Sequence, residues 1–446
     1  MKKSKPHLRA RNHRTRLRLE ALEVRRLLAA DLQLTPVGEM AEVEIEVADD
    51  QVQGHYHADG TFHVEPHDHG HTHDHDDDCS CCLCTQTHSH GEFELRYNSE
   101  GLAYYFDPAP VLDAQEARAD NRSADAGQVS ASAEVKVGLD QIPILNSNPG
   151  APHVFYLDFD GQVVSGTSWN KDNQNNPIHS LAYDLDGDPT TFVPSELDAI
   201  REIWSRVAED YSPFEINITT EEPDEADFRT DRKALRGMIT TNRDETSIGG
   251  TGHEWSKNAG GIAFINSWTW PREEPVWAFY NQLPQTPKAV AEAISHEFGH
   301  ALGLQHDGTT ANPYYRGHGE GVTSWAPIMG AGYDANVTQW SRGDYDGANN
   351  RQDDISIITN DNNRITFRED DHVYGNDEST ALVIENGMIF GSGVIETSTD
   401  RDTFNFTHEG GPVVIKVEPF AIGPNLDIAI ELFSEESAFD LSLIHI

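Results

Sequence analysis

The stretch AVAEAISHEFGHALGLQHDG, residues 289–308, decides the fold of the central part of the chain. On an α-helix, His296 and His300 project from the same face one turn apart, so their imidazole nitrogens can bind one metal ion at about 2 Å. Glu297 follows the first histidine directly, which places it to contact a water on the metal rather than the metal itself. This spacing predicts a helix that carries a metal site.

A third ligand is expected just beyond this helix. Gly303 allows the chain to leave the helix in a left-handed turn, and this turn brings His306 back toward the other two histidines. Three histidines leave the fourth position of a zinc ion open, as in catalytic sites, whereas structural zinc sites are closed by four protein ligands. The sequence therefore predicts one catalytic zinc ion.

The complete pattern HExxHxxGxxH resembles that of the metzincin zinc peptidases. Metzincins carry a methionine turn beneath the zinc, and SWAPIMGAGY (residues 324–333) places Met329 in such a turn, 23 residues after His306. Some metzincins have a zinc-contacting or transition-state-contacting tyrosine two residues after the methionine. Here that position is Ala331, so the nearby Tyr333 is a candidate whose role stays open.

The resemblance also implies a mechanism. In metzincins a zinc-bound water is activated by the glutamate, here Glu297, and attacks the peptide carbonyl. The substrate lies extended along an edge strand, which by resemblance is GGIAFINSW (residues 260–268), and binds by adding a strand to the sheet. We therefore expect a zinc metalloendopeptidase that cleaves bonds within proteins or peptides.

The remaining patterns of residues 151–365 fit an α+β fold of the metzincin type, with a mixed twisted sheet and an active-site helix. HVFYLDFDG (153–161) and FEINITT (214–220) are predicted strands. Between them, apolar residues recur at helical spacing up to Tyr211, with Ser195 and Asp198 as a possible N-terminal capping pair. Together with WSRGDYDGANNRQDDISII, these segments resemble secreted bacterial metzincin-like peptidases.

Composition limits the partners. The 446 residues include 32 Lys and Arg against 75 Asp and Glu, a net charge of −43, which argues against nucleic acid or an anionic membrane as the main partner. No apolar run reaches about 18 residues, so no membrane insertion is expected. We expect a monomer whose partner is its substrate.

The first 35 residues form a basic leader. Ten of the basic residues fall within positions 1–30, and LRLEALEVRRLLA (residues 17–29) resembles an N-terminal sorting segment of exported bacterial proteins. The alternative is a short amphipathic basic helix that binds an anionic surface. The first interpretation predicts a secreted or cell-surface bacterial protein, and the leader is set aside from the fold.

Residues 36–150 are predicted to be an acidic, disordered pro-region or linker. Within residues 55–90 lie ten histidines and all four cysteines, Cys79, Cys81, Cys82 and Cys84. This tract has the chemistry to bind zinc, copper or nickel, but the favoured interpretation is a disordered acidic pro-segment whose metal affinity is incidental. A further alternative is that one of its thiolates or histidines occupies the downstream zinc and inhibits the enzyme until cleavage.

Acidic turns suggest a second metal. Asp184, Asp186 and Asp188 offer oxygen ligands that suit calcium, and so do Asp158 and Asp160. Neither group has the EF-hand spacing with glycine at the sixth position. Solvated turn carboxylates are the alternative explanation, so calcium stays a possible cofactor.

Residues 366–446 have the pattern of short strands separated by Gly-, Asp- and Pro-bearing turns, which is typical of a β-sandwich. GVIETSTDRDTFNF and NLDIAIELF resemble the bacterial pre-peptidase C-terminal domain, an accessory domain of secreted proteases. The chain stops at LSLIHI, before the expected closing strands. We therefore predict an incomplete sandwich with an exposed sheet edge and a truncated end.

Two other functions compete with the endopeptidase. One is a non-catalytic metal-binding or surface-adhesion protein with a relic zinc site, and the presence of Glu297, the three histidines and Met329 argues against it. The other is a zinc hydrolase acting on a non-peptide substrate, which no residue in the sequence excludes.

Overall fold

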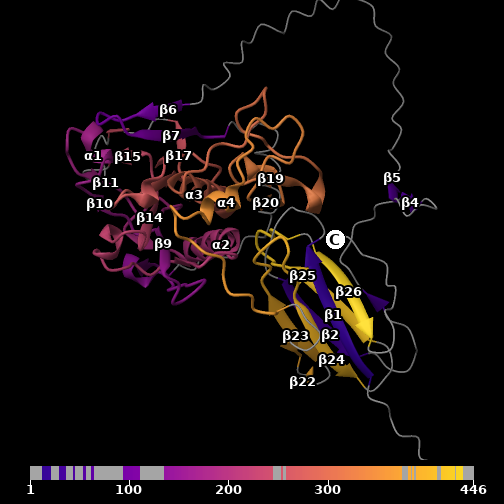
Figure 1. Ribbon diagram of the computed structural model, residues 1–446. Helices are drawn as coiled ribbons and strands as arrows, with labels where there is room; N and C mark the ends of the chain where they lie inside the picture. Colours follow the sequence, from indigo (N-terminus) through magenta and orange to yellow (C-terminus); the bar gives the residue numbers. More distant parts are fainter. Residues whose placement is uncertain are drawn as a thin grey trace, which may run out of the picture.

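The structure is a computed structural model with a seven-stranded, helix-covered sheet beside a second group of sheets (Figure 1). It describes residues 13–21, 30–36, 44–45, 54–56, 62–64, 94–110, 135–244, 253–254, 258–373, 380–382, 384–385, 388–408, 413–426 and 428–434. The four cysteines and most of the His/Cys-rich tract lie outside these residues.

The large sheet has the strand order β13-β9-β14-β18-β17-β7-β6. Its strands are β6 (Glu94–Tyr97), β7 (Ala103–Pro108), β9 (His153–Asp158), β13 (Ile216–Thr219), β14 (Ala234–Thr240), β17 (Ala259–Phe264) and β18 (Val276–Phe279). The strands from β13 to β18 run parallel, and the pairs β18–β17, β17–β7 and β7–β6 are antiparallel. This arrangement agrees with the mixed sheet expected from the sequence.

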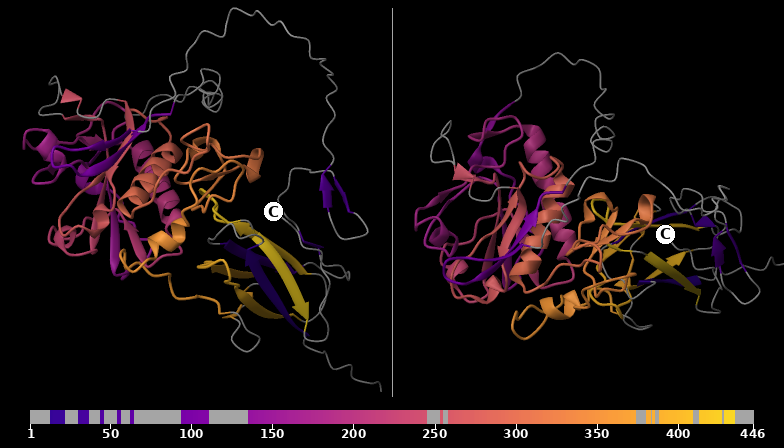
Figure 2. Two further views of the ribbon diagram at one scale, coloured as in Figure 1. Left: turned by 45° about the horizontal axis from the view of Figure 1, so that its top comes forward. Right: turned by 90° about the horizontal axis from the view of Figure 1, so that it is seen from above.

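Two long helices cover one face of this sheet (Figure 2). They are α2 (Pro194–Asp210) and α3 (Pro287–Ala301), and the short helices are α1 (Trp169–Asp172) and α4 (Asp354–Ile358). Fully buried side chains fill the space between the helices and the sheet, among them Phe155, Ile203, Ile294 and Phe298. Because α3 packs on β14, β17 and β18, its residues are held against the sheet where the parallel strands meet the antiparallel ones.

The start of α2 differs from the expected capping pair. Glu196, not Asp198, turns back to the helix start, where its Oε2 accepts a hydrogen bond from the backbone N–H of Val193 at 2.8 Å. Pro194 occupies the first helical position, which needs no N–H donor. Asp198 instead pairs with Arg201 at the surface.

The short strand pairs are peripheral to the large sheet. They are β4 (Gly54–Tyr56) with β5 (Phe62–Val64), β8 (Val137–Gly138) with β12 (Thr191–Phe192), β10 (Val163–Val164) with β11 (Ile178–His179), β15 (Arg243–Asp244) with β16 (His253–Glu254), and β19 (Trp325–Pro327) with β20 (Val337–Gln339).

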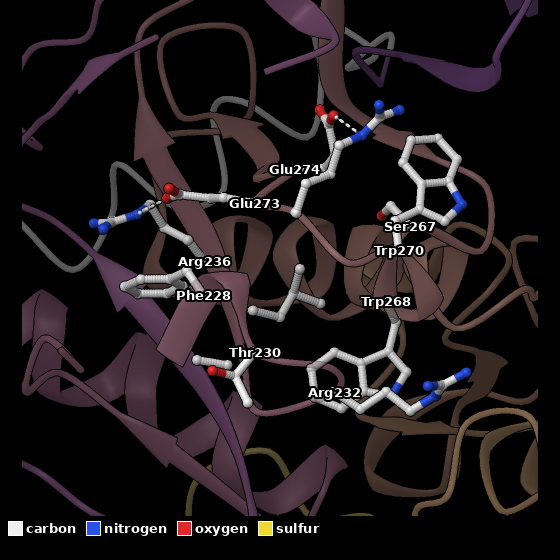
Figure 3. Close-up of a pocket in the computed structure, with 12 residues that line it drawn as sticks. Phe228, Thr230, Arg232, Arg236, Ser267, Trp268, Trp270, Glu273 and Glu274 are labelled. Carbon is white, nitrogen blue, oxygen red and sulfur yellow. Dashed lines mark hydrogen bonds and ion pairs between the residues drawn. The ribbon is translucent and has the colours of Figure 1, made fainter. Parts of the chain in front are cut away.

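A buried arginine stabilises the parallel part of the sheet. Arg236 on β14 is 2% exposed and forms ion pairs with Asp158 at 2.6 Å, Glu222 at 2.8 Å and Glu273 at 2.9 Å. Figure 3 shows the pair with Glu273 beside the ring of Phe228, over which the guanidinium lies at 4.3 Å. The burial of Asp158 raises its pKa to about 7 despite this arginine.

We expect Arg236→Ala to lower the free energy of unfolding by about 3 kcal/mol, because it leaves the buried Asp158 without its ion-pair partner. The matched control is Arg201→Ala, which removes a solvent-exposed pair and should cost less than about 0.5 kcal/mol. Urea denaturation of both full-length variants measures the difference. Equal stability losses would show that the Arg236 cluster contributes no more than a surface pair.

The second group of sheets contains strands from both ends of the chain. Its strands are β1 (His13–Ala21), β2 (Ala30–Pro36), β3 (Glu44–Ile45), β21 (Thr380–Ala381), β22 (Ile384–Glu385), β23 (Met388–Gly393), β24 (Thr403–His408), β25 (Val413–Pro419) and β26 (Ile428–Ser434). The orders are β21-β24-β1-β26 and β22-β23-β2-β25-β3. The two indigo strands lie among the yellow C-terminal strands in Figure 1 and Figure 2.

This pairing differs from the sequence expectation, which set residues 1–35 aside and left the C-terminal sheets without closing strands. β1 lies between β24 and β26, and β2 lies between β23 and β25, so each fills an interior place in its sheet. Strand pairing between segments nearly 400 residues apart leaves no local pattern in the sequence. The resemblance of this region to a pre-peptidase domain stays a prediction.

A buried polar contact joins the second group of sheets to α2. The amide Nδ2 of Asn425 donates to Asp210 Oδ1 at 2.8 Å, and the other oxygen of Asp210 accepts from Ser295 Oγ of α3 at 2.5 Å. The carbonyl of Asn425 accepts from Gln339 Nε2 at 2.5 Å. Asp210 therefore links the last turn of α2, helix α3 and the C-terminal region.

None of the helices within the described ranges combines the length and hydrophobicity that a transmembrane span needs.

Buried carboxyls in the C-terminal region predict a pH-dependent stability. Burial, reinforced by Asp371, raises the pKa of Asp402 to about 9, and burial together with Asp400 raises that of Glu396 to about 9. Between about pH 4 and pH 9 the unfolded state binds fewer protons than the folded state, so stability falls as pH rises.

We therefore expect the melting temperature of Asp402→Asn, measured by thermal denaturation, to be a few degrees higher than that of the wild type at pH 8. At pH 4 the two melting temperatures should be equal. The exposed Asp198→Asn is the control and should give the same melting temperature as the wild type at both values. A gap that does not depend on pH would contradict the protonation argument.

Candidate metal centre

Helix α3 places the first two histidines. It begins after Thr286, whose Oγ1 accepts from the N–H of Ala289 at 3.2 Å, and Pro287 occupies its first position. His296 and His300 lie one turn apart with exposures of 6% and 0%, so both are held within the protein. The predicted helix is therefore present, and it carries both histidines; their role as metal ligands stays a prediction.

The exit from α3 brings in the third histidine. Gly303 has φ +99°, and its N–H donates to the carbonyl of His300 at 2.9 Å, while the N–H of Leu304 donates to Gly299 at 3.0 Å. A Cβ on Gly303 would lie 2.4 Å from Asn266 Oδ1, so both conformation and space favour glycine. After this turn His306 lies against α3, with its Nε2 at 3.0 Å from His300 Nε2.

The donor atoms of the three histidines suit a zinc ion. The Nδ1–H of His296 donates to the carbonyl of Ile328 at 2.9 Å, and that of His300 donates to Leu304 at 2.8 Å, which leaves both Nε2 lone pairs free to bind a metal. In a tetrahedral zinc site with bonds of about 2.1 Å, two ligand atoms lie about 3.4 Å apart. The distance between His300 Nε2 and His306 Nε2 is close to this value, at 3.0 Å. Burial lowers the pKa of His296 to about 3 and also lowers that of His306.

Glu297 lies beside the histidines and against the sheet. It is 1% exposed, and a Cβ on Gly261 of β17 would lie only 2.1 Å from its Oε1, so the glycine makes room for the carboxylate. Burial, together with the neighbouring Asp107, raises the pKa of Glu297 well above its usual range. Glu297, the predicted general base, is thus next to the histidines of α3 and at the backbone of the predicted substrate strand.

Met329 lies in the turn after β19 and packs beneath the helix. It is fully buried, and a Cβ on Gly299 would lie 2.5 Å from its Sδ, which places the thioether directly under the turn between the two histidines. The carbonyl of Met329 accepts from the N–H of Asp307 at 2.7 Å, and the preceding carbonyl, of Ile328, orients His296. The turn therefore holds two of the three histidine segments in place.

A cavity of about 350 Å³ adjoins the site, and Tyr333 lines it together with Glu297, His296 and Ala331. Burial and the nearby carboxylates of Asp107 and Glu297 raise the pKa of Tyr333, so its hydroxyl stays protonated. The structure places Tyr333 at the cavity wall. Any contact between it and a metal or transition state stays a prediction.

Two further residues, Asp107 and Tyr314, belong to this centre and are not predicted by the sequence pattern. Asp107 Oδ1 lies 2.6 Å from His306 Nε2, and its Oδ2 lies 3.4 Å from His300 Nε2. The hydroxyl of Tyr314 donates to Asp107 Oδ1 at 2.6 Å. Burial alone would raise the pKa of Asp107, but the neighbouring imidazoles of His306 and His300 lower it well below its usual range. The carboxylate and the three histidines thus form one possible four-ligand metal site.

The predicted calcium residues form a separate acidic turn. Lys136 pairs with Asp186 at 2.8 Å and with Asp188 at 2.9 Å, while Asp184 Oδ1 accepts backbone hydrogen bonds within the turn. Asp184 and Asp186 also lie near Glu196 in a group with suitable ligand spacing. The lysine neutralises part of this charge, and calcium there stays a prediction.

Residues 215–307 match the family described as Metallo-peptidase family M12B Reprolysin-like. The matched segment runs from the start of β13 through α3 and ends one residue after His306. This match supports a zinc-dependent metallopeptidase. No curated protein and no solved structure matches the chain.

Proposed function

We propose that the chain is a secreted bacterial zinc endopeptidase of the metzincin type. The observation that carries this proposal is the convergence of three buried histidine Nε2 atoms on one point, with Glu297 beside them against β17. The family match to residues 215–307 supports the same reaction class.

The residues have separable roles in peptide hydrolysis. His296, His300 and His306 would hold the zinc, which when bound supplies a Lewis acid for the substrate carbonyl and for water. Glu297 accepts the proton of the attacking water and returns it to the leaving amine. The backbone of β17 would pair with an extended substrate, and the adjoining cavity would take one of its side chains.

A second candidate is favoured by Asp107. A carboxylate beside three histidines completes four protein ligands, which is the arrangement of structural zinc sites. This observation suits a non-catalytic metal-binding or adhesion protein with a relic site. The two candidates differ in the expected activity of an Asp107→Ala variant. An endopeptidase should cleave peptides once this carboxylate is removed, whereas a relic site should gain no activity.

The test is digestion of a quenched peptide library by the full chain and by its Asp107→Ala variant, each loaded with zinc. Cleavage by either protein that stops with a chelator and returns with added zinc supports the endopeptidase. The exposed Asp198→Ala is the matched control and should behave as the wild type. If neither protein cleaves any peptide while holding about one zinc per chain, the proposal fails.

The secreted location is supported by the sorting-segment resemblance of residues 17–29 and by the acidic composition. Since β1 spans residues 13–21 inside a sheet, N-terminal sequencing of the exported protein would show whether this strand is retained. Protein that stays in the cytoplasm would contradict secretion.

A further inference from the structure

We propose that residues 94–110 are an internal inhibitor of the metal centre. In this arrangement Asp107 occupies the fourth ligand position and β7 occupies the edge of β17 to which a substrate would bind. The inference rests on the proposed function, since it describes how the same site is regulated. It differs from the inhibition considered from the sequence, because the blocking group is a carboxylate that follows the His/Cys-rich tract.

The side chain of Asp107 is aimed into the centre. It is 8% exposed, and its two oxygens approach all three histidines, with His296 Nε2 at 3.8 Å from Oδ1 in addition to the two closer contacts. Tyr314 donates a hydrogen bond to Oδ1 and so fixes the carboxylate in this position. A carboxylate oxygen is a normal zinc ligand, so Asp107 fills the place that a water or a substrate carbonyl requires.

The backbone of β7 occupies the edge of β17 with which an extended substrate would have to pair. It pairs antiparallel with β17 from Tyr104 opposite Phe264 to Asp107 opposite Gly261. The ladder extends beyond both ends, because the N–H of Ile265 donates to Ala103 and that of Ala109 donates to Asn258. An extended peptide could pair with β17 only after this strand leaves.

The register has a bulge next to the metal centre, between Ala259 and Gly261 of β17. The extra residue of this bulge is Gly260 of β17, and Asp107 of β7 lies opposite the next residue, Gly261. Gly261 is also the residue that leaves space for Glu297. The bulge, the blocking carboxylate and the general base therefore meet at one point of the strand.

Alternating side chains hold β7 on both faces. Tyr105 shares the face of Asp107, and its ring lies 4.3 Å from those of His300 and His306. Phe106 faces the opposite side, where it is buried with Ile262 and lies under the guanidinium of Arg96 at 3.5 Å. This strand places an aromatic ring over two of the histidines and a carboxylate between them, so it occupies the positions that a metal-bound water and an extended substrate would need.

The test uses full-length chains loaded with Co²⁺, whose visible absorption reports the ligands of the metal. Acetohydroxamate, a small metal-binding probe, is titrated into wild type, Asp107→Asn and Asp107→Ala, with Asp198→Ala as the matched control. Asp107→Asn keeps the shape of the side chain and guards against a folding defect in the alanine variant. We expect the two Asp107 variants to bind the probe at least about tenfold more tightly, since a site blocked more than nine-tenths of the time loses that factor.

Peptide cleavage by the zinc forms separates this inference from the proposed function. Tighter probe binding together with faster cleavage by the Asp107 variants supports both. Tighter probe binding without cleavage of any peptide supports the inhibitor and overturns the peptidase. If all four proteins bind acetohydroxamate with the same affinity and give the same Co²⁺ spectrum, Asp107 is no metal ligand and the internal inhibitor is overturned, whatever their activity.

Discussion

Glu297→Gln is expected to lower kcat/KM for peptide hydrolysis by roughly 10²–10⁴-fold, the contribution of a positioned general base. The amide has nearly the same shape as the carboxylate but cannot accept the proton of water. The measurement is made in an Asp107→Ala background, where no carboxylate of β7 occupies the fourth ligand position. Both the wild-type glutamate and its replacement then face the same metal and the same substrate.

The control for this prediction separates catalysis from metal binding. The zinc content of the Glu297→Gln protein, measured by elemental mass spectrometry, should stay at one per chain because Glu297 is no ligand in the proposed site. Glu225→Gln changes a 75% exposed side chain and should leave kcat/KM unchanged. A Glu297→Gln enzyme that cleaves at the parent rate would show that another group takes the proton.

His300→Ala is expected to have the largest effect on metal affinity. The loss should exceed the roughly 10–100-fold typical of removing an outer-shell partner, because it removes a direct ligand and its hydrogen bond to Leu304. Competition with a zinc-binding dye measures the affinity, and thermal denaturation shows whether the variant is folded.

The matched control is His318→Ala. His318 lies in an exposed loop, where its Nδ1 is 3.0 Å from the hydroxyl of Tyr315, and it does not line the cavity beside Glu297. Its replacement should leave zinc affinity unchanged. If a folded His300→Ala protein binds zinc as tightly as the wild type, the metal is held elsewhere in the chain.

The sequence predicts those helices and strands in which apolar residues recur at a regular spacing. The helix α3 and the strands β9, β13 and β17 lie where their apolar spacing placed them. β14 was missed because ALRGMIT contains Arg236 and Gly237, which interrupt any simple pattern. The arginine is tolerated inside the sheet because three carboxylates surround it, and this compensation comes from residues that are distant in sequence.

In the site, too, residues that are close together in the sequence can be predicted, whereas a residue from a distant segment cannot. His296, His300 and His306 share one short segment, so helix geometry and one glycine are enough to place them together. Asp107 is nearly 190 residues away from the first of them and reaches it through the β7–β17 pairing. The aromatic run Tyr104 to Phe106 before Asp107 and Pro108 was a strand signal, but nothing near it indicates which strand it would join.

The positions of β1 and β2 have a consequence for activation. These strands lie inside the C-terminal sheets, while β7 lies on β17, so the described strands β1, β2 and β7 pair with the rest of the protein in two separate regions. One cut within residues 111–134 would produce two chains, but the N-terminal one would remain anchored through β1 and β2. The severed β7 would then rebind as a tethered ligand at high effective concentration, and dilution would not release it. Nicking and activation would therefore be separate events, the second requiring that β7 itself be destroyed or the tether be cut.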